Sequence, residues 1–82
     1  MKSPHPGETI KEDYLVPLGM SVSRLAGSLG IGAARLNDIV RGRRGISGDT
    51  AVRLARYFGT SAEFWLNLQS LYDLRVAERR AR

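Results

Sequence analysis

The chain has 82 residues, no cysteine and a formal net charge of +5, from 13 basic and 8 acidic side chains. This length allows one small domain without a large enclosed pocket, so an enzyme is the least expected class of protein. The lack of cysteine excludes disulfides and thiolate zinc sites. No apolar run reaches the roughly 18–20 residues of a membrane span, and residues 1–10 do not resemble a signal peptide. We therefore expect a soluble, cytoplasmic protein with no membrane partner.

The N-terminal segment is predicted to be a tail followed by a short helix. Residues 1–6 hold two of the three prolines and are expected to be extended, which leaves His5 mobile and poorly placed to bind a metal. A helix is expected over residues 7–16, because Pro17 disfavours helical backbone at the preceding residue and Gly19 is a common helix end. The apolar residues at helical spacing are Ile10, Tyr14 and Leu18.

Two further helices are predicted next, joined by a turn. The first begins after Ser21, whose side chain is a good N-cap, and ends at Gly30. The second begins near Gly32 or Ala33 and ends at Gly42. The residues expected on their inner faces are Leu25, Ala26, Leu29, Leu36, Ile39 and Val40.

These two helices carry the offsets of a helix-turn-helix. Ala26 is small enough to let the helices cross closely, Gly30 follows where the turn requires a positive φ, and Ile31 plugs the core. Leu36 and Ile39 then supply the inner face of the second helix. The pattern predicts a unit that places its second helix in the major groove of DNA.

The C-terminal half is predicted to contain two more helices, which completes an all-α fold of five helices without strands. One begins after Ser47 and ends at Gly59. The last begins at Thr60, which has the spacing of a capping box with Glu63, and runs to about Ala77. The predicted division of the chain is a tail over 1–6, a compact DNA-binding domain over 7–78 and a basic tail over 79–82.

Positive charge is concentrated on the predicted helix-turn-helix. Residues 22–45 contain five arginines and one aspartate, a clustering that favours a polyanionic partner such as double-stranded DNA. The residues expected to read bases from the outer face of the second helix are Ala34, Arg35, Asn37, Asp38 and Arg41. Those expected to hold phosphates are Ser21, Ser23, Arg43 and Arg44.

Each base-reading assignment has a structural alternative. Asp38 lies three residues from both Arg35 and Arg41, so the alternative is that it merely forms ion pairs with them on the surface. Asn37 could be an ordinary solvated residue. The motif offsets and the charge cluster together favour contact with DNA.

The last predicted helix has a wide apolar arc. Its members are Phe64, Trp65, Leu68, Leu71, Tyr72 and Val76. We expect a homodimer interface that contains Trp65, Leu68, Leu71 and Tyr72, with Trp65 partly in the core. The alternative is that all six side chains serve the core of one protomer.

No catalytic residues, cofactor or metal site are predicted. None of the serines has a histidine placed for a catalytic triad, because His5 is expected to lie in the tail. No glycine-rich phosphate loop follows a strand, since no strand is predicted.

Three stretches resemble a known family and cover nearly the whole chain from His5 onward. They are HPGETIKEDYLVPLGMSVSRLAGSLGI, RLNDIVRGRRGISGDTAVRLARYFGTSAEFWLNLQSLYDL and RVAERR. The resemblance is to HigA-type (VapI-like, plasmid-maintenance antidote) antitoxins of the lambda repressor/Cro (XRE) helix-turn-helix class. It implies a lambda-repressor-like fold, a homodimer on operator DNA and repression of the operon for antitoxin and toxin. It also implies neutralisation of a HigB-type toxin, a RelE-like mRNA endonuclease.

Three positions depart from that family. Val22 stands where members usually have a glutamine that contacts DNA, and Gly32 and Ala34 stand where bulkier residues are frequent. Two alternatives stay open beside the antitoxin: a stand-alone repressor without a toxin, and a protein-interaction module with degenerate DNA binding. The three departures favour the last alternative, and the arginine cluster argues against it.

Overall fold

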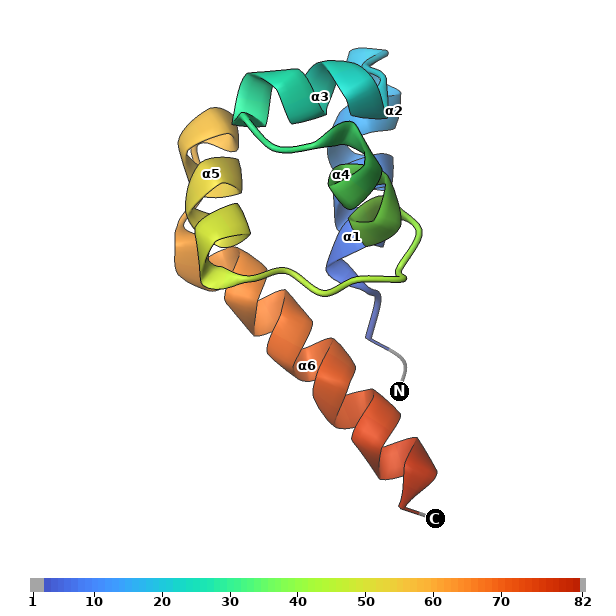
Figure 1. Cartoon of the computed structure of the whole chain (residues 1–82). Coiled ribbons are helices and arrows are strands. Elements are labelled where there is room, and N and C mark those ends of the chain that lie inside the picture. The colour runs from blue at the N-terminus through green and yellow to red at the C-terminus, as the bar shows by residue number, and fades with distance from the viewer. Residues whose placement is uncertain (1–2, 82) are drawn as a thin grey trace.

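The computed structural model describes residues 3–81, and every regular element in this range is helical. The elements are α1 (Pro6–Thr9), η1 (Ile10–Leu15), α2 (Val16–Leu18), α3 (Val22–Leu29), α4 (Ala33–Val40), α5 (Gly48–Phe58) and α6 (Ala62–Arg80). Because α1, η1 and α2 follow one another without a break, the described chain has five helical segments, and the predicted all-α fold is confirmed. They surround one core, with α4 and α5 on opposite sides of it (Figure 1).

The first helical segment differs from the prediction at its C-terminal end. It continues through Val16 and Pro17 and stops at Gly19, whose φ is 61°. The segment η1 is π-helical, so that the Val16 N–H donates to the Lys11 carbonyl five residues back. An α-helix would place the proline ring against the carbonyl four residues before it, and the wider π turn relieves this clash. The prediction that Pro17 ends the helix was therefore wrong, whereas the stop at Gly19 is confirmed.

His5 and Pro6 belong to the packed structure and not to an extended tail, which corrects the predicted tail over residues 1–6. His5 is 7% exposed. Its Nδ1 accepts a hydrogen bond of 2.9 Å from the Gly7 N–H and so caps α1. A Cβ on Gly7 would overlap the Ile39 carbonyl oxygen, so the glycine is what allows this segment to approach α4. Residues 1–2 of the predicted tail lie outside the described residues.

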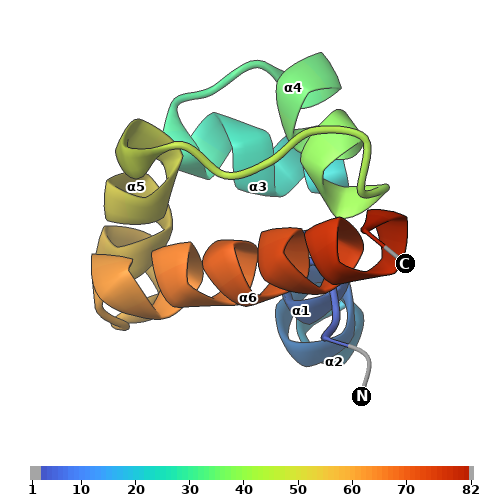
Figure 2. The same ribbon diagram turned by 90° about the horizontal axis from the view of Figure 1, so that it is seen from below.

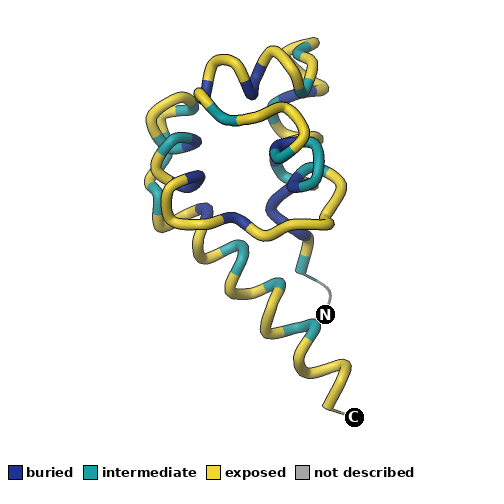
Figure 3. The backbone as a smooth tube through the Cα atoms, in the orientation of Figure 1, coloured by how far each residue is buried: buried dark blue, intermediate teal, exposed yellow. Residues whose placement is uncertain are grey.

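The core draws on every long helix and is sealed by aromatic rings. Figure 3 shows the buried positions on the inner sides of the helices. The buried apolar side chains are Ile10, Leu15, Leu25, Ala26, Leu29, Leu36, Ile39, Ile46, Ala51, Leu54 and Trp65. Tyr14 stacks on Phe58 with ring centroids 3.9 Å apart, and Phe58 lies beside Trp65. These contacts join the first segment to α5 and α6.

Of the N-caps of the last two helices, one agrees with the prediction and the other does not. Ser47 caps α5 as predicted, with its Oγ accepting from the Thr50 N–H. At α6 the cap is Ser61, whose Oγ accepts from the Phe64 N–H at 3.1 Å, so the predicted capping box at Thr60 was wrong. Thr60 instead accepts from the Trp65 indole N–H at 2.7 Å, because a buried indole donor needs a partner.

The helix α6 is longer than predicted and reaches Arg80. In Figure 1 its C-terminal turns run away from the other helices. An ion pair of 2.9 Å between Arg75 and Glu78 lies in this part. The predicted basic tail over 79–82 is therefore helical as far as Arg80, and Arg82 lies outside the described residues.

Candidate nucleic-acid interface

The unit α3–turn–α4 has the geometry that its sequence offsets predict. Gly30 has a φ of 74° and ends α3, and the Ile31 N–H closes the turn on the Ala26 carbonyl at 3.1 Å. Leu36 and Ile39 on α4 are fully buried. The predicted helix-turn-helix, with α3 and α4 as its two helices, is therefore confirmed.

The outward face of α4 combines a small N-terminal end with a polar C-terminal end. Gly32 caps the helix without a side-chain hydrogen bond, and Ala33 and Ala34 are exposed. This lets the backbone approach another surface closely. Farther along, Arg41 is exposed, and Asn37 and Asp38 are half-buried.

Asp38 and Asn37 keep their side chains free within the part of the chain that is described. The ion pairs among residues 3–81 are Arg53–Asp49 and Arg75–Glu78, so the surface pairing of Asp38 with a neighbouring arginine is not seen. The side chains of Asn37 and Asp38 make no hydrogen bond to another of residues 3–81 either. Both are available to a partner.

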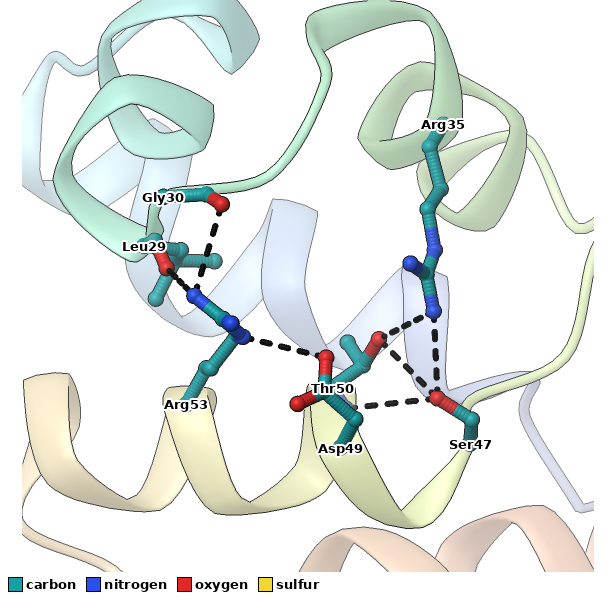
Figure 4. Close-up of polar contacts among 7 residues, drawn as sticks. All are labelled: Leu29, Gly30, Arg35, Ser47, Asp49, Thr50 and Arg53. Carbon is teal, nitrogen blue, oxygen red and sulfur yellow. Dashed lines mark hydrogen bonds and ion pairs between the residues drawn. The ribbon is translucent and has the colours of Figure 1, made fainter.

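Arg35 has a different environment from the one expected of a base reader. Its Nη2 donates to Ser47 Oγ and to Thr50 Oγ1, both at 3.1 Å, as Figure 4 shows. The guanidinium thus ties α4 to the first turn of α5, and its Nε is buried without a partner among residues 3–81. The side chain that the sequence assigned to a base is half-buried and bonded to the protein itself, because the start of α5 brings two hydroxyls within its reach.

A second arginine, Arg53, binds the C-terminal end of α3 in the helix-turn-helix. Arg53 donates from Nη1 to the carbonyl oxygens of Leu29 at 2.9 Å and Gly30 at 3.3 Å, and from Nε to Asp49 at 3.0 Å (Figure 4). A cation at the C-terminal carbonyls of α3 also interacts favourably with the helix dipole. Sequence reasoning missed Arg53, since no short-range pattern shows that α5 lies beside this turn.

The predicted phosphate contacts lie on both sides of α4. Arg43 and Arg44 are exposed on the loop of residues 42–46, which we call the arginine loop. Ser21 and Ser23 are exposed at the start of α3, where the Ser21 Oγ accepts from the Arg24 N–H at 3.1 Å. Arg24 is exposed on the same turn and adds a cation that the site prediction did not include. The surface is basic, with Asp38 as the acidic residue of α4.

The residues predicted for a dimer interface are divided between the core and the surface. Trp65 is fully buried and hydrogen-bonded, so its predicted place at the interface was wrong. Leu68 and Tyr72 are half-buried. Leu68 packs against the core, and the Tyr72 ring packs against the His5 ring with the ring centroids 4.8 Å apart. Leu71 is 45% exposed. Together with the exposed side chains of Phe64 and Leu74, Leu71 forms an apolar stripe on α6, which we call the α6 stripe.

Nothing in the described part of the chain resembles a metal site or a membrane span. Within residues 3–81, no three His, Cys, Asp or Glu side chains gather as metal ligands. No helix in that range is both long and apolar enough to cross a membrane. Burial lowers the pKa of His5, and the nearby carboxylates of Asp73 and Glu8 oppose this only in part.

Comparison with known proteins supports the geometry. Residues 10–65 match the helix-turn-helix family. The chain is 53% identical over 78 residues to virulence-associated protein I of Dichelobacter nodosus, covering 95% of this chain and 72% of that protein. It is 48% identical to Pseudomonas aeruginosa antitoxin HigA, solved with the higBA promoter, over 96% of this chain and 86% of that one, with a TM-score of 0.93. Antitoxin GraA in complex with its operator is 44% identical over 96% and 80% of the two chains, with a TM-score of 0.90.

Proposed function

The chain belongs to the helix-turn-helix family. From this membership and its similarity to the antitoxins HigA and GraA, we propose that it is the antitoxin of a toxin–antitoxin module that represses its own operon. It binds operator DNA as a dimer and neutralises a HigB-type toxin. The single observation that carries the DNA-binding half is the outward face of α4. It has a small N-terminal end, unengaged polar side chains and the exposed arginine loop beside it.

Base recognition falls to two side chains of α4 and to Arg41 at its C-cap. In this proposal Arg41 donates two hydrogen bonds to a guanine edge, Asn37 pairs with an adenine, and Asp38 accepts from a cytosine amino group. Ala34 contributes by being small, so that the helix sits deep in the groove. Arg35 leaves this set and holds α4 in place against α5.

Phosphate contacts fix the register of the unit on DNA. The exposed guanidinium groups of Arg43 and Arg44 flank α4 on one side, and the hydroxyls of Ser21 and Ser23 flank it on the other. Contacts of this kind supply affinity and salt dependence but carry no sequence information.

Two copies are needed to read two half-sites, about 34 Å apart for successive major grooves. The α6 stripe of Phe64, Leu71 and Leu74 supports a homodimer, because three large apolar side chains lie exposed along one helix. Half-buried Leu68 and Tyr72 border the stripe, and Trp65 contributes only through the core.

The toxin partner is inferred from the similarity to antitoxins. HigA and GraA are antitoxins, and HigA is solved with the promoter of a higBA operon. We assign this chain the same kind of partner, a HigB-type mRNA endonuclease, and a place in the cytoplasm beside it. The proposal gives the chain itself a regulatory and not a catalytic role.

The test is binding to the DNA upstream of its own gene. That DNA is compared with scrambled DNA of equal length at two salt concentrations. We expect a preference of about a thousandfold, within the usual range of specific readers. Equal, salt-sensitive binding to both DNAs would contradict the repressor role and leave only phosphate contacts.

The antitoxin role is tested separately by co-expression with the small toxin gene of the same operon. Rescue of growth supports it. Specific DNA binding without rescue identifies a stand-alone repressor instead.

A further inference from the structure

The arginine loop is held at its far end by α6. The Ile46 N–H donates to Gln69 Oε1 at 2.8 Å, across 23 residues of sequence. The side-chain amide of Gln69 lies so close to the loop that a Cβ on Gly45 would be 3.2 Å from three of its atoms. In the view from below, the chain between α4 and α5 crosses in front of α3 and runs in roughly the same direction as α6 (Figure 2). The hydrogen bond from Ile46 to Gln69 joins this chain to α6.

The two ends of the loop are fixed in different ways. At the start, the Gly42 N–H donates to the Ile39 carbonyl at 3.0 Å, and the Arg43 N–H donates to the Asp38 carbonyl at 2.8 Å. At the end, the Ile46 side chain is buried, and its N–H donates to Gln69. The exposed side chains of Arg43 and Arg44 lie between these anchors.

The orientation of the Gln69 amide is determined by a second hydrogen bond. Its Nε2 donates to Asp73 Oδ1 at 2.9 Å, one turn along α6. A carboxylate can only accept, so the amide nitrogen must face Asp73 and the amide oxygen must face the Ile46 N–H. The chain Asp73–Gln69–Ile46 is therefore complete, with each donor facing an acceptor.

We infer that Gln69 is a positioning residue for DNA binding, which holds the arginine loop so that Arg43 and Arg44 reach phosphates, with Asp73 orienting its amide. The inference rests on the proposed function. Because the α6 stripe lies on the same helix, α6 both joins two copies and sets where their arginine loops stand relative to each other. Gln69 itself touches no DNA.

The first test replaces Gln69 by leucine, which keeps the size and removes the acceptor. We expect amide exchange at Ile46 in the free protein to accelerate about tenfold or more. Affinity for the DNA upstream of its gene falls about tenfold. The negative slope of log affinity against log salt becomes shallower by about 0.9 for each phosphate that the loop no longer reaches. The preference for that DNA over scrambled DNA stays unchanged, because the base readers Asn37, Asp38 and Arg41 lie on α4 and at its C-cap, outside the arginine loop. A variant that is merely less stable would not lose affinity and salt dependence while keeping its preference for the upstream DNA.

A donor–acceptor exchange gives the rescue. In Gln69→Glu, two carboxylates face each other across one turn and the hydrogen bond to Ile46 weakens. Adding Asp73→Asn restores it, because the carboxylate at 69 accepts from both the Ile46 N–H and the new amide at 73. The double variant recovers the salt slope that is reduced in Gln69→Glu. This comparison also decides the matter if the leucine variant does not fold.

The control is Ser70→Ala, an exposed position on the same helix, which leaves every quantity unchanged. Wild-type protein that prefers its own upstream DNA, together with a folded leucine variant of unchanged affinity and salt slope, overturns the role of Gln69. Failure of the double variant to recover also overturns it. Wild-type protein without any preference overturns the proposed function instead, and Ile46 exchange still reports the hydrogen bond itself.

Discussion

The helix-turn-helix and α6 differ in how far along the chain their contacts reach. In α3–turn–α4, the turn is closed between Ile31 and Ala26, only a few residues apart. In α6, Gln69 holds the loop at Ile46, and Tyr72 packs on His5, at the other end of the described chain. The DNA-reading unit is thus built from local signals, but distant segments hold its loop and its flanks in place. Local patterns are readable from a sequence, and such supports are not.

The largest expected effect is on the core side of α6. Trp65→Ala should lower the free energy of unfolding by about 3–5 kcal/mol, because it empties the centre of the core and leaves Thr60 without its indole donor. Denaturant titration followed by circular dichroism measures this. Leu71→Ala, on the exposed side, is the matched control and should change the unfolding of the protomer little. A Trp65 variant of normal stability that no longer dimerises would return this residue to the interface.

The next effect is expected on the DNA-facing side of α4. Arg41→Ala should cost about 1–3 kcal/mol at the operator and less on scrambled DNA, because one base is left without its hydrogen-bonding partner. Arg43→Ala should weaken binding to both DNAs alike and reduce the magnitude of the salt slope by about 1. Fluorescence anisotropy at several salt concentrations separates the two. Equal reductions on both DNAs for Arg41→Ala would place this residue on a phosphate.

A smaller effect tests the support of the turn by α5. Arg53→Met keeps much of the side-chain length but removes the hydrogen bonds to the Leu29 and Gly30 carbonyls, and should cost about 1–2 kcal/mol of unfolding free energy. Thermal unfolding provides the measurement. The exposed Arg56→Met on the same helix is the control. Equal stability of the two variants would show that the turn needs no support from α5.

The smallest expected effect concerns His5, which lies where the N-terminal segment packs against Tyr72 of α6. His5 is buried with a lowered pKa, and its Nδ1 must be unprotonated to accept from the Gly7 N–H. A folded pKa below the ordinary value means that the stabilisation is full above about pH 6.5 and is lost as the pH falls through the folded pKa. His5→Asn retains a capping acceptor without a titrating group.

The measurement is the unfolding midpoint of the wild-type and His5→Asn proteins between about pH 7.5 and about pH 5, a range chosen around the ordinary histidine pKa of about 6.5. The wild-type protein should lose stability toward acid more steeply than the variant. Parallel curves would mean that His5 is not buried as a neutral ring.

The comparison also explains where the structure departs from what the sequence suggests. Arg35 was predicted to read a base from its position on α4 alone, and in the fold its guanidinium bonds to two hydroxyls at the start of α5. His5 was assigned to a tail because prolines flank it, and the ring of Tyr72 from α6 covers it. In both cases the partners are distant in sequence.

By itself the sequence determined the helix-turn-helix, since Ala26, Gly30 and Leu36 act on neighbours within a few residues, where steric rules apply directly. It also determined the caps at Ser21 and Ser47, which bond their own helices. The tertiary structure alone decided the inward turn of Arg35, the hold of Gln69 on the arginine loop, and the place of Trp65 in the core. The physical reason is that a side chain takes the best partner within its reach, and the packing of the helices determines which partners those are.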